Sequence, residues 1–417
     1  MKQTIKDIDI RNKRLLIRVD FNVPLDKASG TITDDTRIRE SLPTIRHCLE
    51  HGASVVLMSH LGRPEGKRVP SLSLRPVATR LGELLGRPIT FVEDCVGTEV
   101  EARVKALRPG EVALLENLRF HTEEEANDPG FAAALARLGT LYVNDAFGTA
   151  HRAHASTEGV AHHLPAVAGF LMEKEMKYLE GALRDPARPY AAILGGAKVS
   201  DKIGVLKRLL EQVDRVLIGG GMAYTFLKAC GHAVGSSRLE GDKLELAKQL
   251  MALAAQRKVA FVLPTDHIVT TSLDPGSDVK TVSTIDIPEG WLGADIGPTS
   301  TAAFIALLKD ARTVVWNGPV GVFEQSRFCE GSRRIAQTLA QLKATTIIGG
   351  GDTAACVQQF GLGDRMSHIS TGGGASLEFL EGKTLPGIAI LNDRREERSG
   401  LRAVGSGQLP RTPSPER

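Results

Sequence analysis

Short apolar runs alternate along the chain with longer stretches in which apolar side chains recur every three or four residues. The short runs are rich in leucine and β-branched residues, and they predict strands at residues 15–19, 54–58, 111–115, 140–143, 190–194, 215–218, 259–263, 313–316 and 345–348. Strands that alternate with helices form parallel sheets covered by helices on both faces. With 417 residues, the chain is long enough for two such α/β domains.

The longer stretches predict amphipathic helices. A helix over residues 37–50 has one apolar stripe, which consists of Ile38, Leu42, Ile45 and Leu49. A helix over residues 200–213 has an inward face made of Ile203, Leu206, Leu209, Leu210 and Val213.

The pattern changes between residues 161 and 183, where we predict the domain boundary. Leu164, Pro165 and Gly169 interrupt the periodicity, and residues 173–183 then predict one amphipathic connecting helix. We therefore predict a first domain over residues 1–170 and a second over residues 171–380. Residues 392–417 contain almost no bulky apolar side chains and are rich in Arg, Glu, Ser and Pro, so they predict a disordered tail.

Composition narrows the class of protein. The apolar fraction of 42%, the charged fraction of 24% and the net charge of +3 are ordinary for a globular protein and give no support for a nucleic-acid or membrane partner. Five scattered cysteines without C-x-x-C spacing favour buried, reduced thiols over a disulfide framework or a zinc site. The chain starts without an apolar signal segment and contains no run of membrane-spanning length, so we expect a soluble, cytoplasmic protein.

Four glycine runs in the second half follow apolar runs or precede predicted helices. They lie at residues 195–196, 219–221, 349–351 and 372–374. Glycine lets the backbone approach a ligand closely, and a helix start offers free N–H groups and the positive end of a dipole. Each run alone is also typical of a tight turn in an α/β sheet, whereas four together favour a cradle for phosphate.

Arginines in the first half follow predicted strands. Arg63, Arg119 and Arg152 each come shortly after a strand, and Arg37 begins a predicted helix. Ligands of open α/β sheets bind beyond the carboxyl ends of the strands, so these arginines predict a site for a small, multiply anionic molecule. Asp20 and Asn22, which follow the first strand, would orient its hydroxyl groups. The alternative is that each arginine is a solvated surface residue.

Charged residues near the glycine runs are candidates for nucleotide binding. Lys198 and Lys202 flank the start of a predicted helix and would neutralise phosphates, although a solvated pair is the alternative. Asp352 is a helix cap or a ligand of the Mg²⁺ that bridges nucleotide phosphates, and Thr353 would assist with phosphate. Glu324 would accept hydrogen bonds from ribose hydroxyls, or is simply exposed.

Several familiar sites are absent from the sequence. It contains no G-x-x-x-x-G-K-[ST] motif, and no glycine run forms G-x-G-x-x-G followed by a suitably spaced acid, so a P-loop enzyme and a dinucleotide dehydrogenase are disfavoured. His151, His154, His162 and His163 have no cysteine or well-spaced carboxylate to complete a ligand set, which disfavours a metal site there.

The motifs at these positions resemble those of the phosphoglycerate kinase family. In the first half they are Arg-Val-Asp-Phe-Asn-Val-Pro at residues 18–24, Ser-His-Leu-Gly-Arg-Pro at 59–64, Glu-Asn-Leu-Arg-Phe at 116–120 and Ala-His-Arg-Ala-His at 150–154. In the second half they are Gly-Gly-Ala-Lys-Val-Ser-Asp-Lys at 195–202, Gly-Gly-Gly-Met-Ala at 219–223, Asn-Gly-Pro-Val-Gly-Val-Phe-Glu at 317–324 and Gly-Gly-Asp-Thr at 350–353.

The resemblance implies two Rossmann-like three-layer domains with parallel sheets, joined by a hinge helix, with residues 381–391 returning to the first domain. The implied substrate residues are Asp20, Phe21, Asn22, Arg37, His60, Leu61, Gly62, Arg63, Arg119 and Arg152. The implied nucleotide residues are Gly195, Lys198, Lys202, Gly219, Gly293, Asn317, Pro319, Glu324, Gly350, Gly351, Asp352 and Thr353. The implied catalytic residues are Arg37, Lys198, Gly351 and Gly373, with Asp352 as the ligand of Mg²⁺.

The implied reaction is reversible phosphoryl transfer between 1,3-bisphosphoglycerate and ADP, which gives 3-phosphoglycerate and ATP in a monomer that closes about its hinge. Both nucleophiles are already ionised at neutral pH, so the transfer needs alignment and charge stabilisation rather than a general base. Two alternatives remain open at this point. One is a non-catalytic two-lobed anion-binding protein, and the other is an acyl-phosphate kinase for a different small acid.

Overall fold

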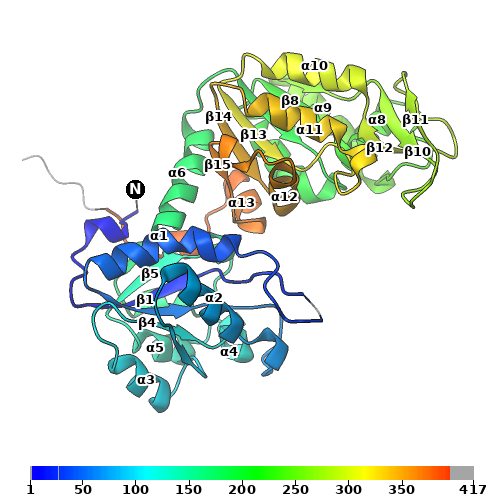
Figure 1. The fold of residues 1–417 in the computed structure, drawn as a ribbon. Coiled ribbons are helices and arrows are strands. Elements are labelled where there is room, and N and C mark those ends of the chain that lie inside the picture. The colour runs from blue at the N-terminus through cyan, green and yellow to red at the C-terminus, as the bar shows by residue number, and fades with distance from the viewer. Residues whose placement is uncertain (1, 27, 395–417) are drawn as a thin grey trace, which may run out of the picture.

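The computed structural model describes residues 2–26 and 28–394. The chain forms two lobes, and helix α6 (Phe170–Arg184) runs from one to the other (Figure 1). Each lobe contains a six-stranded sheet. The part of the predicted tail beyond residue 394 lies outside the described residues.

The first lobe is built on an all-parallel sheet with the strand order β3-β4-β2-β1-β5-β6. Its strands are β1 (Arg14–Val19), β2 (Ser54–Met58), β3 (Thr90–Val92), β4 (Val112–Leu115), β5 (Leu141–Asp145) and β6 (Ala166–Ala168). Parallel strands point their carboxyl ends to one edge, so the loops that follow them gather there.

The second lobe has a parallel sheet with the order β15-β14-β13-β7-β8-β9. Its strands are β7 (Tyr190–Leu194), β8 (Arg215–Ile218), β9 (Ala260–Val262), β13 (Thr313–Asn317), β14 (Thr345–Gly349) and β15 (His368–Ile369). A small antiparallel sheet with the order β11-β10-β12 is formed by β10 (His267–Thr270), β11 (Val279–Val282) and β12 (Leu292–Ile296).

Helices cover the sheets. In the first lobe they are α1 (Thr36–Glu50), α2 (Arg75–Leu85), α3 (Thr98–Lys105), α4 (Thr122–Glu125) and α5 (Pro129–Ala136). In the second they are α7 (Ile203–Leu209), α8 (Gly220–Ala229), α9 (Leu244–Gln256), α10 (Pro298–Leu308), α11 (Glu330–Leu339), α12 (Gly351–Gln359) and α13 (Gly374–Leu380), followed by α14 (Pro386–Ala389). The 3₁₀ turns are η1 (Ile5–Asp7), η2 (Pro70–Leu72), η3 (Leu118–Phe120), η4 (Phe147–Thr149), η5 (Gly159–His162), η6 (Ser200–Lys202), η7 (Gly241–Lys243), η8 (Ser326–Phe328) and η9 (Gly363–Arg365). No described helix is both long and apolar enough to cross a bilayer.

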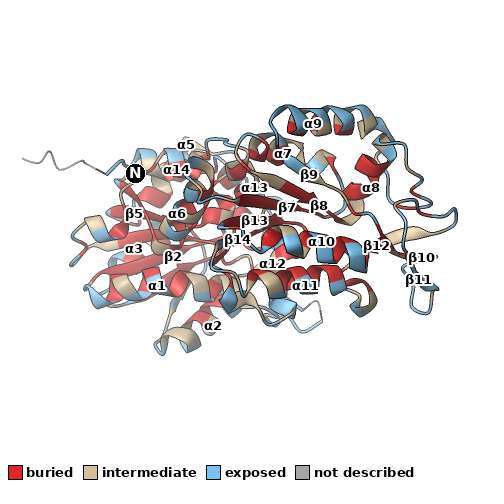
Figure 2. Cartoon of the chain, turned by 90° about the horizontal axis from the view of Figure 1, so that it is seen from above, coloured by how far each residue is buried: buried red, intermediate tan, exposed pale blue. Residues whose placement is uncertain are grey.

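The strands are apolar on both faces because helices pack on both. Leu15 and Ile17 of β1 join the core beneath α1 and α2, whereas Leu16 joins the core on the opposite face of the sheet. The alternation follows from the period of two along a strand. Figure 2 shows the same arrangement in the second lobe, where β7 and β8 are buried and α9 exposes its outer face.

One predicted helix is shorter than expected. Residues 200–213 form a 3₁₀ turn, then α7, and then turns that end at Val213. The carboxylate of Glu240 accepts hydrogen bonds from the backbone N–H groups of Val199 and Ser200, at 2.5 and 3.1 Å, and so binds the free N–H groups at the start of this segment. A helical periodicity does not reveal this contact with a distant segment.

Helix α6 is fixed to the second lobe by a buried carboxylate. Glu175 is fully buried and accepts hydrogen bonds from His368 Nε2 at 2.7 Å, Ser370 Oγ at 2.8 Å and the backbone N–H of Thr371 at 2.7 Å. The ring of Tyr178 stacks on that of His368 at 4.8 Å. These contacts orient the segment that leads to the glycine run at residues 372–374.

The end of the described chain returns to the first lobe. The backbone N–H of Gly387 donates to Ala150 O at 2.9 Å, and Asn144 Nδ2 donates to Gly387 O at 3.0 Å. The backbone N–H of Asn392 donates to Ala166 O at 2.9 Å beside β6. Two chain segments therefore connect the lobes, and α6 is one of them.

A second buried carboxylate accepts hydrogen bonds from the start of α6. Asp145, at the end of β5, is fully buried and accepts hydrogen bonds from the N–H groups of Leu171 at 2.9 Å and Met172 at 3.4 Å. A side chain at Gly169 would clash with this carboxylate, so the close approach requires glycine. Burial raises the pKa of Asp145 to about 7, and its hydrogen bonds offset this only in part.

We predict that Asp145→Asn stabilises the protein more at pH 8 than at pH 5. Between the usual carboxyl pKa of 3.8 and the folded value of about 7, the native state binds more protons than the unfolded state, so stability falls as pH rises. The amide does not titrate, and the advantage of the variant should grow by on the order of 2–4 kcal/mol across this window. Calorimetric unfolding of the variant and the wild type at several pH values measures this difference in stability.

Asp185→Asn is the matched control, because Asp185 is exposed at the other end of α6. Its effect should be small and the same at every pH. An Asp145→Asn effect that is equally independent of pH would contradict the prediction.

Candidate active site

A cavity of about 310 Å³ opens at the carboxyl edge of the first sheet. The segments after β1, β2, β4 and β5 and the start of α1 supply most of its walls, and the glycine run after β15 supplies the rest. We call it the arginine cavity, and its lining residues are Asp20, Asn22, Arg37, His60, Gly62, Arg63, Arg119, Gly148, Thr149, His151, Arg152, Gly372, Gly373 and Gly374. Every residue predicted for the acid substrate lines it except Phe21 and Leu61. These two are buried behind the wall, with 0% and 2% of their surface exposed.

The arginine cavity is strongly positive. Its four arginines face one carboxylate, Asp20, with which Arg37 forms an ion pair. Burial alone would raise the pKa of Asp20, but the charges of Arg37 and Arg18 and the hydrogen bond from the Asn22 N–H lower it to about 2. Arg119 is paired with Glu125 at 3.1 Å, whereas Arg63 and Arg152 form no ion pair within 4.0 Å among the described residues. Free positive charge therefore remains for an anionic ligand.

His60 is neutral and fixed in one orientation. It is buried, and burial lowers its pKa well below the ordinary value despite the nearby Asp20 carboxylate. Arg18 Nη2 lies 3.2 Å from His60 Nδ1. Because a guanidinium only donates, Nδ1 accepts and the ring proton lies on Nε2. His60 can thus offer a neutral N–H donor to a ligand in the cavity.

A second cavity, of about 520 Å³, lies at the carboxyl edge of the second sheet. We call it the nucleotide cavity. Its lining residues are Gly196, Ala197, Gly220, Gly221, Tyr224, Ser236, Arg238, Leu273, Leu292, Gly293, Ala294, Pro319, Gly321, Val322, Phe323, Glu324 and Asp352. Glycines, Asp352 and Glu324 provide polar ends, and aromatic and aliphatic side chains provide an apolar wall. A flat base with a polar phosphate tail suits such a cavity.

Of the residues predicted for the nucleotide, Gly293, Pro319, Glu324 and Asp352 line this cavity. A side chain at Gly293 would clash with the hydroxyl of Tyr224, so glycine keeps the cavity open. Others lie behind the wall and shape it. A side chain at Gly195 would clash with the carbonyl oxygen of Pro319, and one at Gly219 with Val320.

Three further predicted nucleotide residues also support the wall. Thr353 is buried, and its hydroxyl accepts a hydrogen bond from the N–H of Gly318 at 2.7 Å. Asn317 is buried beside Gly350, which adopts a positive φ of 86°. Thr353, Asn317 and Gly350 therefore fix the backbone at the ends of β13 and β14, beside the nucleotide cavity.

The two predicted lysines lie in different surroundings. Lys202 Nζ donates to the side-chain and backbone oxygens of Asn317, the latter at 3.2 Å. Burial lowers the pKa of Lys202 to about 8, although Asp352 and Asp201 act in the opposite direction. Lys198 is exposed on the preceding turn and donates no hydrogen bond to a described residue. Sequence spacing alone does not distinguish the two.

A third cavity, of about 520 Å³, lies between the lobes. Thr36, Arg37 and Glu40 of α1 form one side of this interlobe cavity, and the start of α12 and the segment after β15 form the other. It brings together three of the four residues predicted to be catalytic: Arg37, Gly351 and Gly373. Arg37 and Gly373 also line the arginine cavity, and Gly351 precedes Asp352 of the nucleotide cavity. The four glycine runs therefore serve three adjoining cavities rather than one cradle.

Comparison with known proteins agrees with this arrangement. A family model described as phosphoglycerate kinase matches residues 5–383. The chain is 57% identical over 393 residues to a phosphoglycerate kinase of Moorella thermoacetica, covering 94% of this chain and 100% of that protein. It is 60% identical over 389 residues to one of Rippkaea orientalis, covering 92% and 97%. The chain belongs to the phosphoglycerate kinase family.

Solved structures extend the likeness to the fold. The phosphoglycerate kinase of Coxiella burnetii superposes with a TM-score of 0.85 at 43% identity, covering 94% of this chain and 98% of that one. That of Pyrococcus horikoshii gives a TM-score of 0.79 at 33% identity, covering 93% and 98%. The predicted class of two Rossmann-like α/β domains with parallel sheets is confirmed.

Sequence reasoning missed a buried polar chain behind the arginine cavity. Arg18, in the middle of an apolar strand, has 1% of its surface exposed and donates through Nε to Ser156 Oγ at 2.8 Å. Ser156 Oγ donates in turn to Glu124 Oε1 at 2.5 Å, and Glu124 is fully buried. The one available signal was a charge inside an otherwise apolar strand. Through Arg18, which contacts His60 Nδ1, this polar network would hold His60 in place.

We predict that Arg18 and Glu124 are strongly coupled in stability. Either single substitution, Arg18→Met or Glu124→Gln, leaves a buried charge without its partner, whereas the double variant removes both. A double-mutant cycle should give a coupling free energy of about 1–3 kcal/mol, measured by denaturant unfolding.

The control cycle uses Arg103 and Glu99, an exposed pair at 3.2 Å on α3. Its coupling should stay below about 0.5 kcal/mol. Additive effects of Arg18→Met and Glu124→Gln would show that the buried chain is not an electrostatic unit.

Proposed function

We propose that this protein catalyses reversible, Mg²⁺-dependent phosphoryl transfer between 1,3-bisphosphoglycerate and ADP, giving 3-phosphoglycerate and ATP. The observation that carries the proposal is that Arg37 lines both the arginine cavity and the interlobe cavity. A phosphoryl group that moves from one lobe to the other would pass this guanidinium.

The arginine cavity is proposed to hold the phosphoglycerate. Arg63, Arg119 and Arg152 supply planar donors that suit phosphate and carboxylate groups. Asp20 is ionised and Asn22 offers an amide, and both suit the hydroxyl of a glycerate. His60 adds a neutral donor that leaves the positive charge of the cavity unchanged.

The nucleotide cavity is proposed to hold ADP or ATP, with Glu324 near the ribose and Lys202 near the phosphates. Asp352 is exposed at the cavity and pairs with no cation within 4.0 Å among the described residues, so its carboxylate fits a Mg²⁺ ligand. Bound there with the nucleotide, Mg²⁺ would neutralise phosphate charge. Carboxylate and phosphate oxygens suit this hard cation.

Transfer requires alignment of two groups held by different lobes. The attacking carboxylate or phosphate oxygen is already ionised, so the protein needs no general base. We assign stabilisation of the moving charge to Arg37, Lys198 and the backbone N–H groups of Gly351 and Gly373. Lys198 is exposed in the present arrangement, so closure of the lobes would have to bring it to the phosphates.

The proposal includes a cytoplasmic monomer that acts on small molecules and has no nucleic-acid or membrane partner. The net charge of +3 gives no support for a nucleic-acid or membrane partner, and the five free cysteines support a reducing compartment.

The direct test is a coupled assay of nucleotide consumption with 3-phosphoglycerate, acetate and other small acids. We expect turnover with 3-phosphoglycerate and MgATP and loss of turnover when Mg²⁺ is chelated. Turnover only with another acid would identify a different acyl-phosphate kinase. Binding of 3-phosphoglycerate without any turnover would identify a non-catalytic anion-binding protein.

We predict that Arg37→Ala and Arg63→Ala affect different kinetic constants. Arg37→Ala should lower kcat by about 10²–10³-fold with little change in nucleotide affinity, because its contact is made mainly in the transition state. Arg63→Ala should raise the KM for 3-phosphoglycerate by about 10- to 100-fold, because it removes a charge-assisted contact with the bound acid. Steady-state kinetics with both substrates varied separates the two.

Arg39→Ala provides the control, since Arg39 is on α1 but pairs with Asp35 at 2.7 Å and lines neither the arginine cavity nor the interlobe cavity. Both constants should stay near the wild-type values. Equal losses in kcat and substrate affinity for Arg37→Ala would argue against its assigned role.

A further inference from the structure

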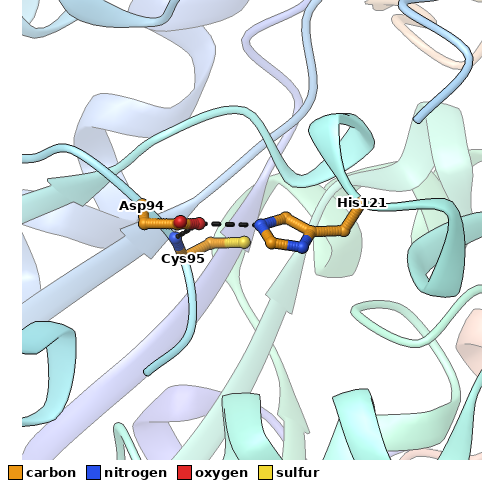
Figure 3. Close-up of side chains that lie close together, drawn as sticks. All are labelled: Asp94, Cys95 and His121. Atoms are coloured by element: carbon orange, nitrogen blue, oxygen red, sulfur yellow. Dashed lines mark hydrogen bonds and ion pairs between the residues drawn. The ribbon is translucent and has the colours of Figure 1, made fainter. Parts of the chain in front are cut away.

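Three side chains with metal-binding atoms meet on the first lobe, away from the nucleotide cavity. Asp94 and Cys95 follow β3, and His121 follows η3. Figure 3 shows the three side chains directed toward one another from two loops. One ligand atom from each lies within 4.8 Å of the other two.

We propose that Asp94, Cys95 and His121 form a binding site for a divalent transition-metal cation of the zinc class. Thiolate and imidazole ligands select such cations over Mg²⁺ and Ca²⁺, which prefer oxygen ligands alone. Three protein ligands leave a fourth position of a tetrahedral site for water or a small ligand.

The geometry needs only a small adjustment. The present distance between Asp94 Oδ1 and His121 Nε2 is 2.7 Å, which is a hydrogen bond. Around a tetrahedral zinc ion, neighbouring ligand atoms lie about 3.3–3.6 Å apart. The Asp94–His121 distance would therefore increase by less than about 1 Å, and the distances to Cys95 Sγ, which are within 4.8 Å, would decrease by at most about 1.5 Å.

A bound cation would have to displace protons that His121 and Cys95 hold tightly. Hydrogen bonding to Asp94 raises the pKa of His121, and Glu123 acts in the same direction, whereas burial and Arg68 oppose it. Cys95 is fully buried, and burial together with Asp94 and Glu124 raises the pKa of its thiol. A coordinated cation would replace that proton, because a metal-bound thiol is deprotonated. Asp94 and His121 are partly exposed, which leaves a route for the ion.

The competing explanation is purely structural. The Asp94–His121 hydrogen bond joins two loops, and Cys95 belongs to the apolar core of the lobe. Both loops follow strand ends, and η3 also carries Arg119 of the arginine cavity. A bound metal would fix the same two loops more tightly, so the two explanations need a readout that is specific to coordination.

Titration of the full-length, metal-free protein with Co²⁺ provides that readout, because thiolate ligation gives a charge-transfer band in the near ultraviolet. We expect one equivalent to develop the band and Zn²⁺ to displace it. Cys95→Ser should abolish the band, and His121→Gln should weaken Zn²⁺ binding in isothermal calorimetry by at least about 100-fold. Added Zn²⁺ should also raise the Tm of the wild type but not of either variant.

Cys230→Ser is the matched control, because Cys230 is the exposed cysteine of the five. It should keep the band and the affinity. Circular dichroism of each metal-free variant establishes that it is folded, and the His121→Gln result stands even if Cys95→Ser is unstable. Absence of the band in the wild type, or its persistence in folded His121→Gln at unchanged affinity, would overturn the proposal and leave the structural pair.

Discussion

The positions of the arginine cavity and the nucleotide cavity depend on the parallel direction of the strands in the two large sheets. Because all six strands of a sheet end at one edge, the loops after β1, β2, β4 and β5 must meet, whatever their separation in sequence. The backbone N–H groups and side chains at that edge are not used by the sheet. Each lobe therefore presents a polar rim above an apolar interior, and the ligands of a phosphoglycerate kinase suit those rims.

Concentrating arginines at one rim is electrostatically unfavourable without a ligand, and the structure limits this with a few carboxylates. Asp20 pairs with Arg37, and Glu125 pairs with Arg119, while Glu124 compensates the buried Arg18 through Ser156. Arg63 and Arg152 line the same cavity and form no ion pair with a described residue. Pairing some arginines and leaving others free keeps the rim folded and still able to attract an anion.

Periodicity was sufficient to predict the strands, the long helices and the two-sheet class, because burial on both faces requires apolar runs of characteristic length. Position after a strand correctly placed Arg63, Arg119 and Arg152 on one cavity. Contacts between segments that are distant in the sequence could not be predicted from it. Glu240 accepts hydrogen bonds at the start of the helix predicted over residues 200–213, and Lys202 lies against Asn317 while Lys198 stays exposed. The cluster of Asp94, Cys95 and His121 joins two loops in the same way.

The buried contacts of α6 also limit how the lobes can move. Glu175 ties α6 to His368, Ser370 and Thr371, and the glycine run that follows, with Gly373, reaches the arginine cavity of the other lobe. Breaking these hydrogen bonds would leave a carboxylate buried without partners, so a closing motion should preserve them. The second-lobe end of α6 would then move as one unit with the glycine run. Any change in lobe arrangement must be taken up elsewhere, at the start of α6 near Asp145 and in the segment that precedes α14.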